Sequence, residues 1–588
     1  MAPRIIRVNM TDQSIKEELF PEKYATFGGR ALTTNIVADE VDPLCHPLGP
    51  NNKLVFAPGI VTGTKAPSSG RLSVGGKGAL TNTLKEANAG GLTAQKLAKL
   101  DIKAVIIEGQ PKDPGDKWWN LVITKDKIEL VDGTWGYQMG LYELITKVWE
   151  KYPNNPGICG CGPTGQRLLK ASGIFGNNIE NTDPGRYAGR GGLGAVLGSK
   201  RIIAIITDDT GGEAPAPADP EKFENGRIAL HDALLGHAVT GKDGGLQNYG
   251  TNVLQNIINE AGALPVRNWT KGQWDGAAKV SGEAVHELVD KTKEKFGDAA
   301  EGTYAHPCHP GCIMRCSNTV PNPDTGKAVV SPLEYETAWA LGSNTEIDNL
   351  QDVAMLNRVC NDIGLDTIEA GNILSVAMDA GIIPFGDGPK AIELLKECAK
   401  GTPMGNILGS GALTVGDTYG VTRVAQVKGQ SLPAYDPRVI KGIGVTYATG
   451  PQGGCHTQGY TVAAEILGIK GEVTDKFALE KSDLSRAFQA TTAYIDSTGY
   501  CLFIAFAILD VDEGFQGMVD TINAMLGQEI DAVGYGSAVL KREREFNRKA
   551  GFNEAHDRLP EFMKLEPVPP HNAIFDVSDE ELDKVHGK

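Results

Sequence analysis

Residues 308–316 read Cys308-His309-Pro310-Gly311-Cys312-Ile313-Met314-Arg315-Cys316, and we take this turn as the centre of the fold. Its three cysteines stand at equal four-residue intervals, and the Pro310-Gly311 pair prevents a helix from beginning cleanly there. The segment should therefore wrap around a ligand. With the distant Cys501 it offers three close thiolates and one remote thiolate, which is the ligand count of a cubane iron–sulfur cluster.

A zinc site is the main alternative for the same residues. Structural zinc is more usually bound by two Cys-x-x-Cys pairs or by histidines at helical spacing, and this turn has neither pattern. His306 and His309 nevertheless permit a mixed Cys/His zinc site. Unrelated core cysteines are the third possibility. The ligand count favours the cluster, and the residues alone leave all three open.

The composition describes a large globular protein. The chain has 588 residues, 41% hydrophobic and 22% charged, which suggests roughly three domains. Its formal charge of −16 argues against a nucleic-acid groove or an anionic membrane surface. No apolar run approaches the ~20 residues of a spanning helix, and the first residues lack a signal-peptide core. We expect a cytoplasmic protein whose ten cysteines are free for metal binding.

Glycine is unusually abundant, with 73 residues, and it gathers in short turns without any period. Three glycine groups set an arginine or an amide beside permissive backbone, which suits phosphate or a polycyclic heteroatom ring. They are Gly28-Gly29-Arg30; Ser69-Gly70-Arg71 with Asn88-Ala89-Gly90-Gly91; and 189–194. The last group superficially resembles a dinucleotide fingerprint, but we expect no strand directly before it. Ordinary tight turns are the alternative for each group.

The chain divides by its periodicity into an α+β fold. Residues 1–209 carry the strand signals and predict a β-rich base domain, and residues 210–220 form a Gly/Ala/Pro linker. Apolar residues then recur at helical spacing, which predicts two mainly α-helical domains at 221–430 and 431–588. The expected strands are 4–9, 53–57, 103–108 and 201–207, with a hairpin at 118–124 and 128–131.

Two turns in the helical half share one plan. Residues 361–366 and 496–501 each follow a predicted helix, contain a glycine, and end in a polar or thiol side chain, Asp366 or Cys501. A glycine there caps a helix in the left-handed conformation, reverses the chain and presents the next side chain. The pair suggests two pseudo-symmetric domains that hold one ligand at their junction. Plain helix caps are the alternative.

Glu334 and His456 are candidates for proton transfer. Glu334 begins an apolar helix and His456 follows a glycine turn. A carboxylate and an imidazole are a common acid/base pair. The alternatives are a helix-start carboxylate favoured by the dipole and a satisfied loop histidine.

Taken jointly, these motifs resemble the tungsten-dependent aldehyde:ferredoxin oxidoreductase family, most closely the catalytic subunit of its bacterial aldehyde oxidoreductases. The likeness covers nearly the whole chain. It rests on the cysteine turn, both glycine-capped turns and the segments 69–71, 88–91, 190–200, 264–269 and 334–336.

The resemblance implies a tungsten atom held by the sulfurs of two pyranopterins (tungstopterin), whose phosphates a magnesium ion bridges. It places Arg71, Asn88, Gly90, Arg190 and Gly191 near the pterins and phosphates, and Asp366, Asp496 and Tyr500 against the pterin rings. It makes Cys308, Cys312, Cys316 and Cys501 the ligands of one [4Fe-4S] cluster, and it makes Glu334 and His456 face the tungsten as catalytic residues.

The implied activity is the reversible oxidation of aldehydes to carboxylic acids. Electrons would leave singly through the cluster to ferredoxin or a ferredoxin-like iron–sulfur subunit, with a further FAD/NAD subunit where NAD is reduced, so we expect an oligomer. The alternatives are a related tungstopterin enzyme of the benzoyl-CoA reductase type and a zinc-stabilised, non-enzymatic scaffold.

The chain departs from the family pattern in three places. Asn361 stands where the first turn usually has an aspartate, and three residues instead of two separate Cys308 from Cys312. The Glu-x-x-His at 283–286 lies upstream of where some relatives bind an intersubunit metal, so we expect no such metal.

Overall fold

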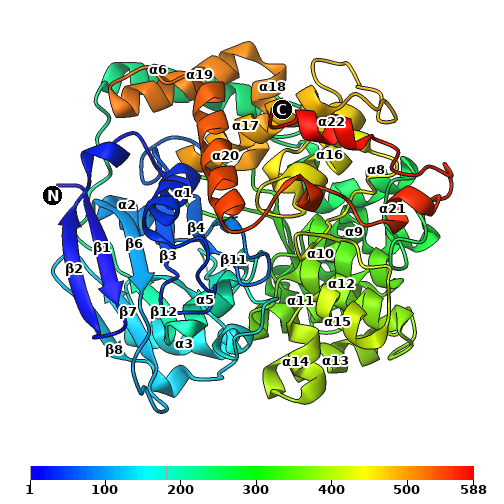
Figure 1. Ribbon diagram of the computed structural model, residues 1–588, viewed down its shortest axis with the longest axis horizontal. Helices are drawn as coiled ribbons and strands as arrows, with labels where there is room; N and C mark the ends of the chain where they lie inside the picture. Colours follow the sequence, from blue (N-terminus) through cyan, green and yellow to red (C-terminus); the bar gives the residue numbers. More distant parts are fainter. Residues whose placement is uncertain (1, 180–182, 588) are drawn as a thin grey trace.

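A computed structural model describes residues 2–179 and 183–587 and shows a β-rich N-terminal part beside a larger helical part (Figure 1). The first sheet has the strand order β2-β1-β6-β3-β4-β5 and the second β11-β10-β9-β12-β7-β8. Both are mixed, because β1 and β6 run parallel, as do β7 and β12, while the other neighbours are antiparallel. The strands are β1 Arg4–Asn9, β2 Ser14–Leu19, β3 Leu54–Pro58, β4 Leu72–Lys77, β5 Leu84–Ala89, β6 Ile102–Glu108, β7 Trp119–Ile123, β8 Ile128–Asp132, β9 Gly157–Cys161, β10 Ile174–Gly176, β11 Arg186–Ala188 and β12 Ile202–Thr207.

The two sheets pack face to face around one apolar core. Alternate side chains of each strand point to opposite faces, so Ile6 and Val8 enter this shared core while Ile5 packs on the outer side. Helix α1 (Gly29–Glu40) covers the outer face of the first sheet, and α3 (Leu141–Lys151) covers that of the second. Strands buried on both faces have continuous apolar sequences, which explains why β6 and β12 give the clearest strand signals.

Helices dominate the remainder, and a small sheet of β13 (Thr303–His306), β14 (Ser317–Pro321) and β15 (Ala328–Val330) frames the cysteine turn. The α+β fold class predicted from the sequence is confirmed. The helices are α2 Thr93–Lys99, α4 Pro163–Gln166, α5 Leu193–Ser199, α6 Pro220–Gly236, α7 Gly245–Tyr249, α8 Leu254–Glu260, α9 Gly282–Phe296, α10 Tyr335–Leu341, α11 Leu350–Ile363, α12 Thr367–Asp379, α13 Gly388–Lys400, α14 Pro403–Gly409, α15 Ala412–Tyr419, α16 Lys441–Thr449, α17 Ser482–Thr498, α18 Ala505–Asp510, α19 Asp512–Leu526, α20 Ala532–Lys549, α21 Phe562–Leu565 and α22 Asp579–Lys584.

Helix α6, which follows the linker, lies along α19 near the end of the chain (Figure 1). Its N-cap Asp219 accepts from Lys222 N and donates its own N–H to Ala524 O. The first helix after the predicted boundary thus shares a core with the last third of the sequence. The domain boundaries themselves stay predictions.

We expected the three glycine groups to form loops, but the first two include residues of a helix and of a strand. Gly28-Gly29-Arg30 opens α1, and Asn88 and Ala89 are the last residues of β5. Strand β11 runs directly into 189–192, so the prediction that no strand precedes this group is wrong. The reason is length, because three residues paired with β10 are too few to show an alternating pattern.

Both predicted glycine caps are present. Gly364 ends α11 with a φ of 87°, and Gly499 ends α17 with a φ of 93°. Both lie in the left-handed region, so each reverses the chain after its helix. Among the described residues, no helix combines the length and the apolar character needed to cross a membrane.

Candidate functional site

The cysteine turn connects β13 to β14 and meets two other segments through backbone hydrogen bonds. Ser68 N donates to Gly311 O at 2.9 Å, and Ser68 O accepts from Cys501 N at 2.9 Å. Ser68 therefore joins the turn to the segment after α17, across almost two hundred residues of sequence. In this way the structure brings Cys501 to Cys308, Cys312 and Cys316, and each of the four is 7–8% exposed.

The four thiols influence one another's ionisation. A hydrogen bond with Cys312 holds the pKa of Cys308 well below its usual range, and the same contact, followed by burial, raises the pKa of Cys312. Burial, with the nearby Cys308 charge, raises the pKa of Cys501 to about 11. Only one thiol of such a group ionises easily, so binding through all four sulfurs requires the positive charge of a metal centre.

Beside this turn lies a cavity of about 380 Å³. Its wall is built from β5, the β11–α5 loop, the start of α10, the two glycine-capped turns and the loop before residue 456. Eleven of the predicted site residues line it: Arg71, Asn88, Gly90, Arg190, Cys308, Cys316, Glu334, Asp366, His456, Asp496 and Cys501.

Three predicted residues are not on the wall. Cys312 lies behind it in the turn, and Gly191, with a φ of 86°, leaves the space that the Lys85 side chain occupies. Tyr500 is fully buried in an apolar core with Tyr494 and Ile504, and this position does not support its assignment to cofactor binding. After the Gly499 cap the chain directs Tyr500 inward and leaves Cys501 beside the cavity.

Glu334 sits at the start of α10 with both carboxyl oxygens engaged. Oε2 accepts from Thr251 Oγ1 at 2.5 Å, and Oε1 accepts from Ser317 Oγ at 3.2 Å. Burial raises the pKa of this carboxyl, while the Thr251 hydrogen bond and Arg186 work in the other direction. A carboxylate with a raised pKa is a better proton acceptor near neutral pH.

His456 is paired with Glu336, a residue to which the sequence alone gives no role. His456 Nε2 lies 3.3 Å from Glu336 Oε1, and Glu336 Oε2 accepts from Ala434 N at 3.0 Å. The other ring nitrogen, Nδ1, is buried without a hydrogen-bond partner. Burial opposes the imidazolium, but Glu336 and the Cys455 sulfur outweigh it and raise the pKa of His456. The free nitrogen is therefore available to a bound ligand.

Cys455 is a second site residue that the sequence motifs do not identify. Its thiol is buried in the cavity wall, and although burial opposes ionisation, His456 and Arg190 hold its pKa well below the usual range. The only sequence signal is its place between the glycine turn and His456.

Arginines and carboxylates form the rest of the polar wall. Arg71 Nη2 donates to Asn88 O at 3.2 Å, and Arg190 Nε lies 3.3 Å from Asp366 Oδ2. Asp366 also caps α12 by accepting from Ile368 N. Burial, and then the charge of Glu86, raise the pKa of Asp496 to about 8 although Arg30 lies 3.3 Å away. This wall can donate to anions and accept from N–H groups.

Glu283 and His286 point to different partners. Glu283 Oε2 accepts from Asn256 Nδ2 at 2.9 Å, and His286 Nδ1 lies 2.7 Å from Asn248 O.

Among the described residues, one group has donor atoms close enough together to hold a metal ion. It consists of Cys308, His309 and Cys312.

Two family profiles together span almost the whole chain. Residues 5–209 match the N-terminal domain of aldehyde ferredoxin oxidoreductase, and residues 230–586 match domains 2 and 3 of the same family.

Whole-length relatives agree with these profiles. The tungsten-containing aldehyde ferredoxin oxidoreductases of Pyrococcus furiosus and Thermococcus kodakarensis are each 34% identical, over 96% of this chain and 92% of theirs. The solved active-site complex BamBC of benzoyl coenzyme A reductase, bound to 1,5-dienoyl-CoA, superposes with a TM-score of 0.78 over 99% of this chain and 92% of the other. At 16% identity this last likeness concerns the fold alone.

Proposed function

Because this chain belongs to the aldehyde ferredoxin oxidoreductase family and is an oxidoreductase, we propose that it oxidises aldehydes to carboxylic acids, reversibly, with tungsten as its metal. The observation that carries the proposal is one continuous cavity. It extends from the buried cysteines to Glu334 and His456 and is lined by eleven residues that the family resemblance assigns to the site. The same family membership sets aside the non-enzymatic scaffold.

The cavity suits a tungstopterin. His456 Nδ1 and Glu86 Oε1 are buried without partners, and a buried polar atom left in this state costs about 1–3 kcal/mol unless a ligand satisfies it. Arg71, Asn88 and Gly90 would hold one pterin and its phosphate, and a magnesium ion would neutralise phosphate charge. Arg190, Asp366 and Asp496 would hold the ring edges of the pair. When bound, the cofactor supplies the two-electron acceptor for the aldehyde carbon.

Cys308, Cys312, Cys316 and Cys501 would hold a [4Fe-4S] cluster beside this cofactor. Arg71 is suited to the space between the two groups, because burial opposes its charge but the charges of Cys501 and Cys308 outweigh burial and raise its pKa. Electrons would leave singly to ferredoxin or a ferredoxin-like subunit, and NAD reduction would need a further FAD/NAD subunit. The reaction balances as aldehyde plus water giving acid, two protons and two electrons.

The protein's own groups supply the proton chemistry. Glu334 takes a proton from the water that adds to the carbonyl carbon, because its raised pKa makes it basic enough near neutral pH. His456 donates from Nδ1 to the carbonyl oxygen, because Glu336 pairs with Nε2 and favours the protonated ring by raising its pKa against the effect of burial. Each role is worth roughly 10²–10⁴ in rate.

Elemental analysis and an aldehyde-dependent viologen assay test the proposal. We expect about one tungsten and about four irons per chain, a cluster stoichiometry typical of four cysteine ligands. Glu334→Gln and His456→Asn should each lower turnover roughly 10²-fold or more while metal content stays unchanged. Glu283→Gln, whose carboxylate accepts from Asn256 away from the cavity, is the matched control. A metal-loaded protein that reduces viologen with an aromatic CoA thioester and not with aldehydes would support the benzoyl-CoA reductase alternative.

A further inference from the structure

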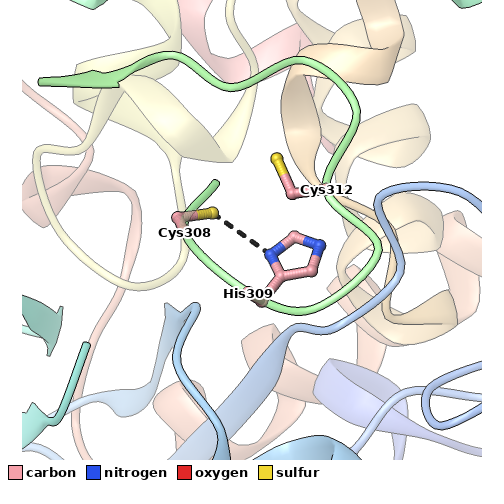
Figure 2. A group of neighbouring side chains, drawn as sticks. All are labelled: Cys308, His309 and Cys312. Carbon is pink, nitrogen blue, oxygen red and sulfur yellow. Dashed lines mark hydrogen bonds between the residues drawn. The ribbon is translucent and has the colours of Figure 1, made fainter. Parts of the chain in front are cut away.

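His309 is the one imidazole in the described cysteine turn, and it stands between the first two cysteines of that turn. The side chain is fully buried, and its Nδ1 lies 3.1 Å from the sulfur of Cys308 (Figure 2). The contact joins neighbouring residues, so the turn itself sets its geometry.

The residues around the His309 ring leave a space that fits it. A Cβ at Gly70 would lie 2.5 Å from His309 Cδ2, so only glycine leaves room for the imidazole there. Gln95 Nε2 donates to Pro310 O at 2.6 Å, and Cys312 N donates to His309 O at 3.1 Å. These contacts fix the backbone at and after His309, and Gly70 leaves room for the ring beside Cys308.

The chemistry of the contact depends on the state of the sulfur. A cysteine that binds a cluster is a thiolate and has no proton to donate, so the hydrogen bond needs an N–H on Nδ1. An N–H directed at a ligand sulfur stabilises negative charge on the cluster. Reduction adds one negative charge, so the reduced state gains more from the hydrogen bond than the oxidised state.

We propose that His309 donates its Nδ1–H to the Cys308 sulfur and so raises the reduction potential of the cluster. The inference rests on the proposed cluster. His309 acts through Cys308, and it eases the transfer of electrons from the buried cofactor into the relay without touching the substrate.

A competing role for His309 is direct metal ligation. The donor atoms of Cys308, His309 and Cys312 lie within 4.8 Å of one another, which also suits one shared ion. The two roles differ in the effect of losing the nitrogen. Removing a metal ligand releases metal. Removing a hydrogen-bond donor leaves the cluster in place and changes its reduction potential.

The test is a redox titration of the holoenzyme followed by EPR, comparing His309→Phe with His309→Asn. Phenylalanine keeps a ring against Gly70 but has no donor, and asparagine places an amide N–H near the former Nδ1. We expect His309→Phe to keep its iron and to become harder to reduce by about tenfold in the one-electron equilibrium, which corresponds to about 59 mV. His309→Asn should recover part of that shift.

A direct readout accompanies the titration. The cluster signal of the wild type should show coupling to a nitrogen and an exchangeable proton, and His309→Phe should lose both. An unchanged potential in His309→Phe, or loss of iron in that variant alone, overturns the proposal. Wild-type protein without iron refutes the proposed cluster itself, so the two failures are distinguishable.

Discussion

Glu336 orients His456 and also favours its protonated form. The ion pair of 3.3 Å engages Nε2 and leaves Nδ1 buried without a hydrogen-bond partner, so the two ring nitrogens have different surroundings. Tyr435 and Tyr460 pack around the ring, with centroids 5.9 Å and 6.1 Å away, and restrict its rotation. Two carboxylates at one helix start thus serve two sides of the cavity, Glu334 on one and Glu336 on the other.

Glu336→Gln should therefore change the pH dependence of aldehyde oxidation. Removing the carboxylate lowers the pKa of His456, and the imidazolium needed for donation is lost at lower pH. The alkaline limb of kcat/KM should move to lower pH, and activity above neutrality should fall roughly tenfold for each pH unit that the limb moves. The other groups facing the ring, Arg190, Cys455 and the tyrosines, remain in place.

Glu336→Asp serves as the matched control, because it keeps the charge and should restore most of the wild-type profile. A Gln variant whose alkaline limb coincides with that of the wild type would show that Glu336 has no such role.

At the residue level, the sequence identified the site better through joint motifs than through any single residue. The cavity wall contains the predicted arginines and aspartates and three of the four predicted cysteines, and each of these residues belongs to a quoted motif. Glu336 and Cys455 went unassigned because nothing local distinguishes them. Their roles arise from pairing across more than a hundred residues, which spacing cannot reveal.

At the scale of elements, apolar periodicity predicted the strands and helices that pack against a single core. The hairpin of β7 and β8 and the strands β1, β6 and β12 were predicted near their observed bounds. Strand β5 was missed because it carries Lys85, Glu86 and Asn88 toward the cavity and the polar interior. Buried polar residues that serve a ligand remove the alternation on which strand prediction depends.

The C-terminal segment, 557–587, packs against α16, the helix that precedes the loop carrying His456. It crosses the surface beside α16 and ends next to it (Figure 1). Arg486 Nε donates to Val585 O at 2.8 Å, and His586 Nε2 lies 3.0 Å from Thr449 O, the last residue of α16. Val568, Phe575 and Val585 add their side chains to the core beneath. The segment thus supports α16, which ends shortly before the loop that carries His456.

This support should weaken in acid through His586. Burial, and then the charge of Arg544, lower the pKa of His586 to about 3, so the folded state holds the ring neutral. The unfolded chain binds a proton below its ordinary pKa near 6.5, so stability falls as pH decreases from there toward 3.

The contribution of His586 to the slope of unfolding free energy against pH should approach about 1.4 kcal/mol per pH unit. His586→Gln should flatten the decline in unfolding free energy between pH 6 and 4.5, as measured by urea titration. Exposed His571→Gln is the control and should follow the wild type. Equal slopes in the wild type and His586→Gln would refute the role of His586.

At the scale of the whole molecule, the cavity is where distant parts of the chain meet. Its wall takes residues from the β-rich part, from the middle helices and from the last third of the sequence. Arg30 in α1 contacts Glu543 in α20 through two hydrogen bonds of 2.9 Å, and Asp496 lies beside them. The sequence predicted the parts, and the family resemblance predicted that they share one ligand. Neither the sequence patterns nor the family resemblance predicted that α6 packs against α19.

The cofactor should accordingly stabilise the entire fold. Without it, the buried polar groups of the wall lose their ligand, and the contacts between the β-rich and helical parts must hold the junction alone. A ligand present at a thousandfold excess over its Kd stabilises by about 4 kcal/mol. With an unfolding entropy of about 2 cal/mol/K per residue, this corresponds to a rise in Tm of about 3 °C for a chain of 588 residues.

The measurement compares protein produced with and without tungstate, by calorimetry and by hydrogen exchange. We expect the cofactor-free protein to melt at least a few degrees lower and to lose amide protection together in β5, α10 and α17, the elements that meet at the cavity. An unrelated metal-free protein added to both samples controls for the buffer. Loss of protection confined to one element would show that the cofactor stabilises only its local wall. Equal Tm values and equal protection in the two preparations would show that the three parts hold together without it.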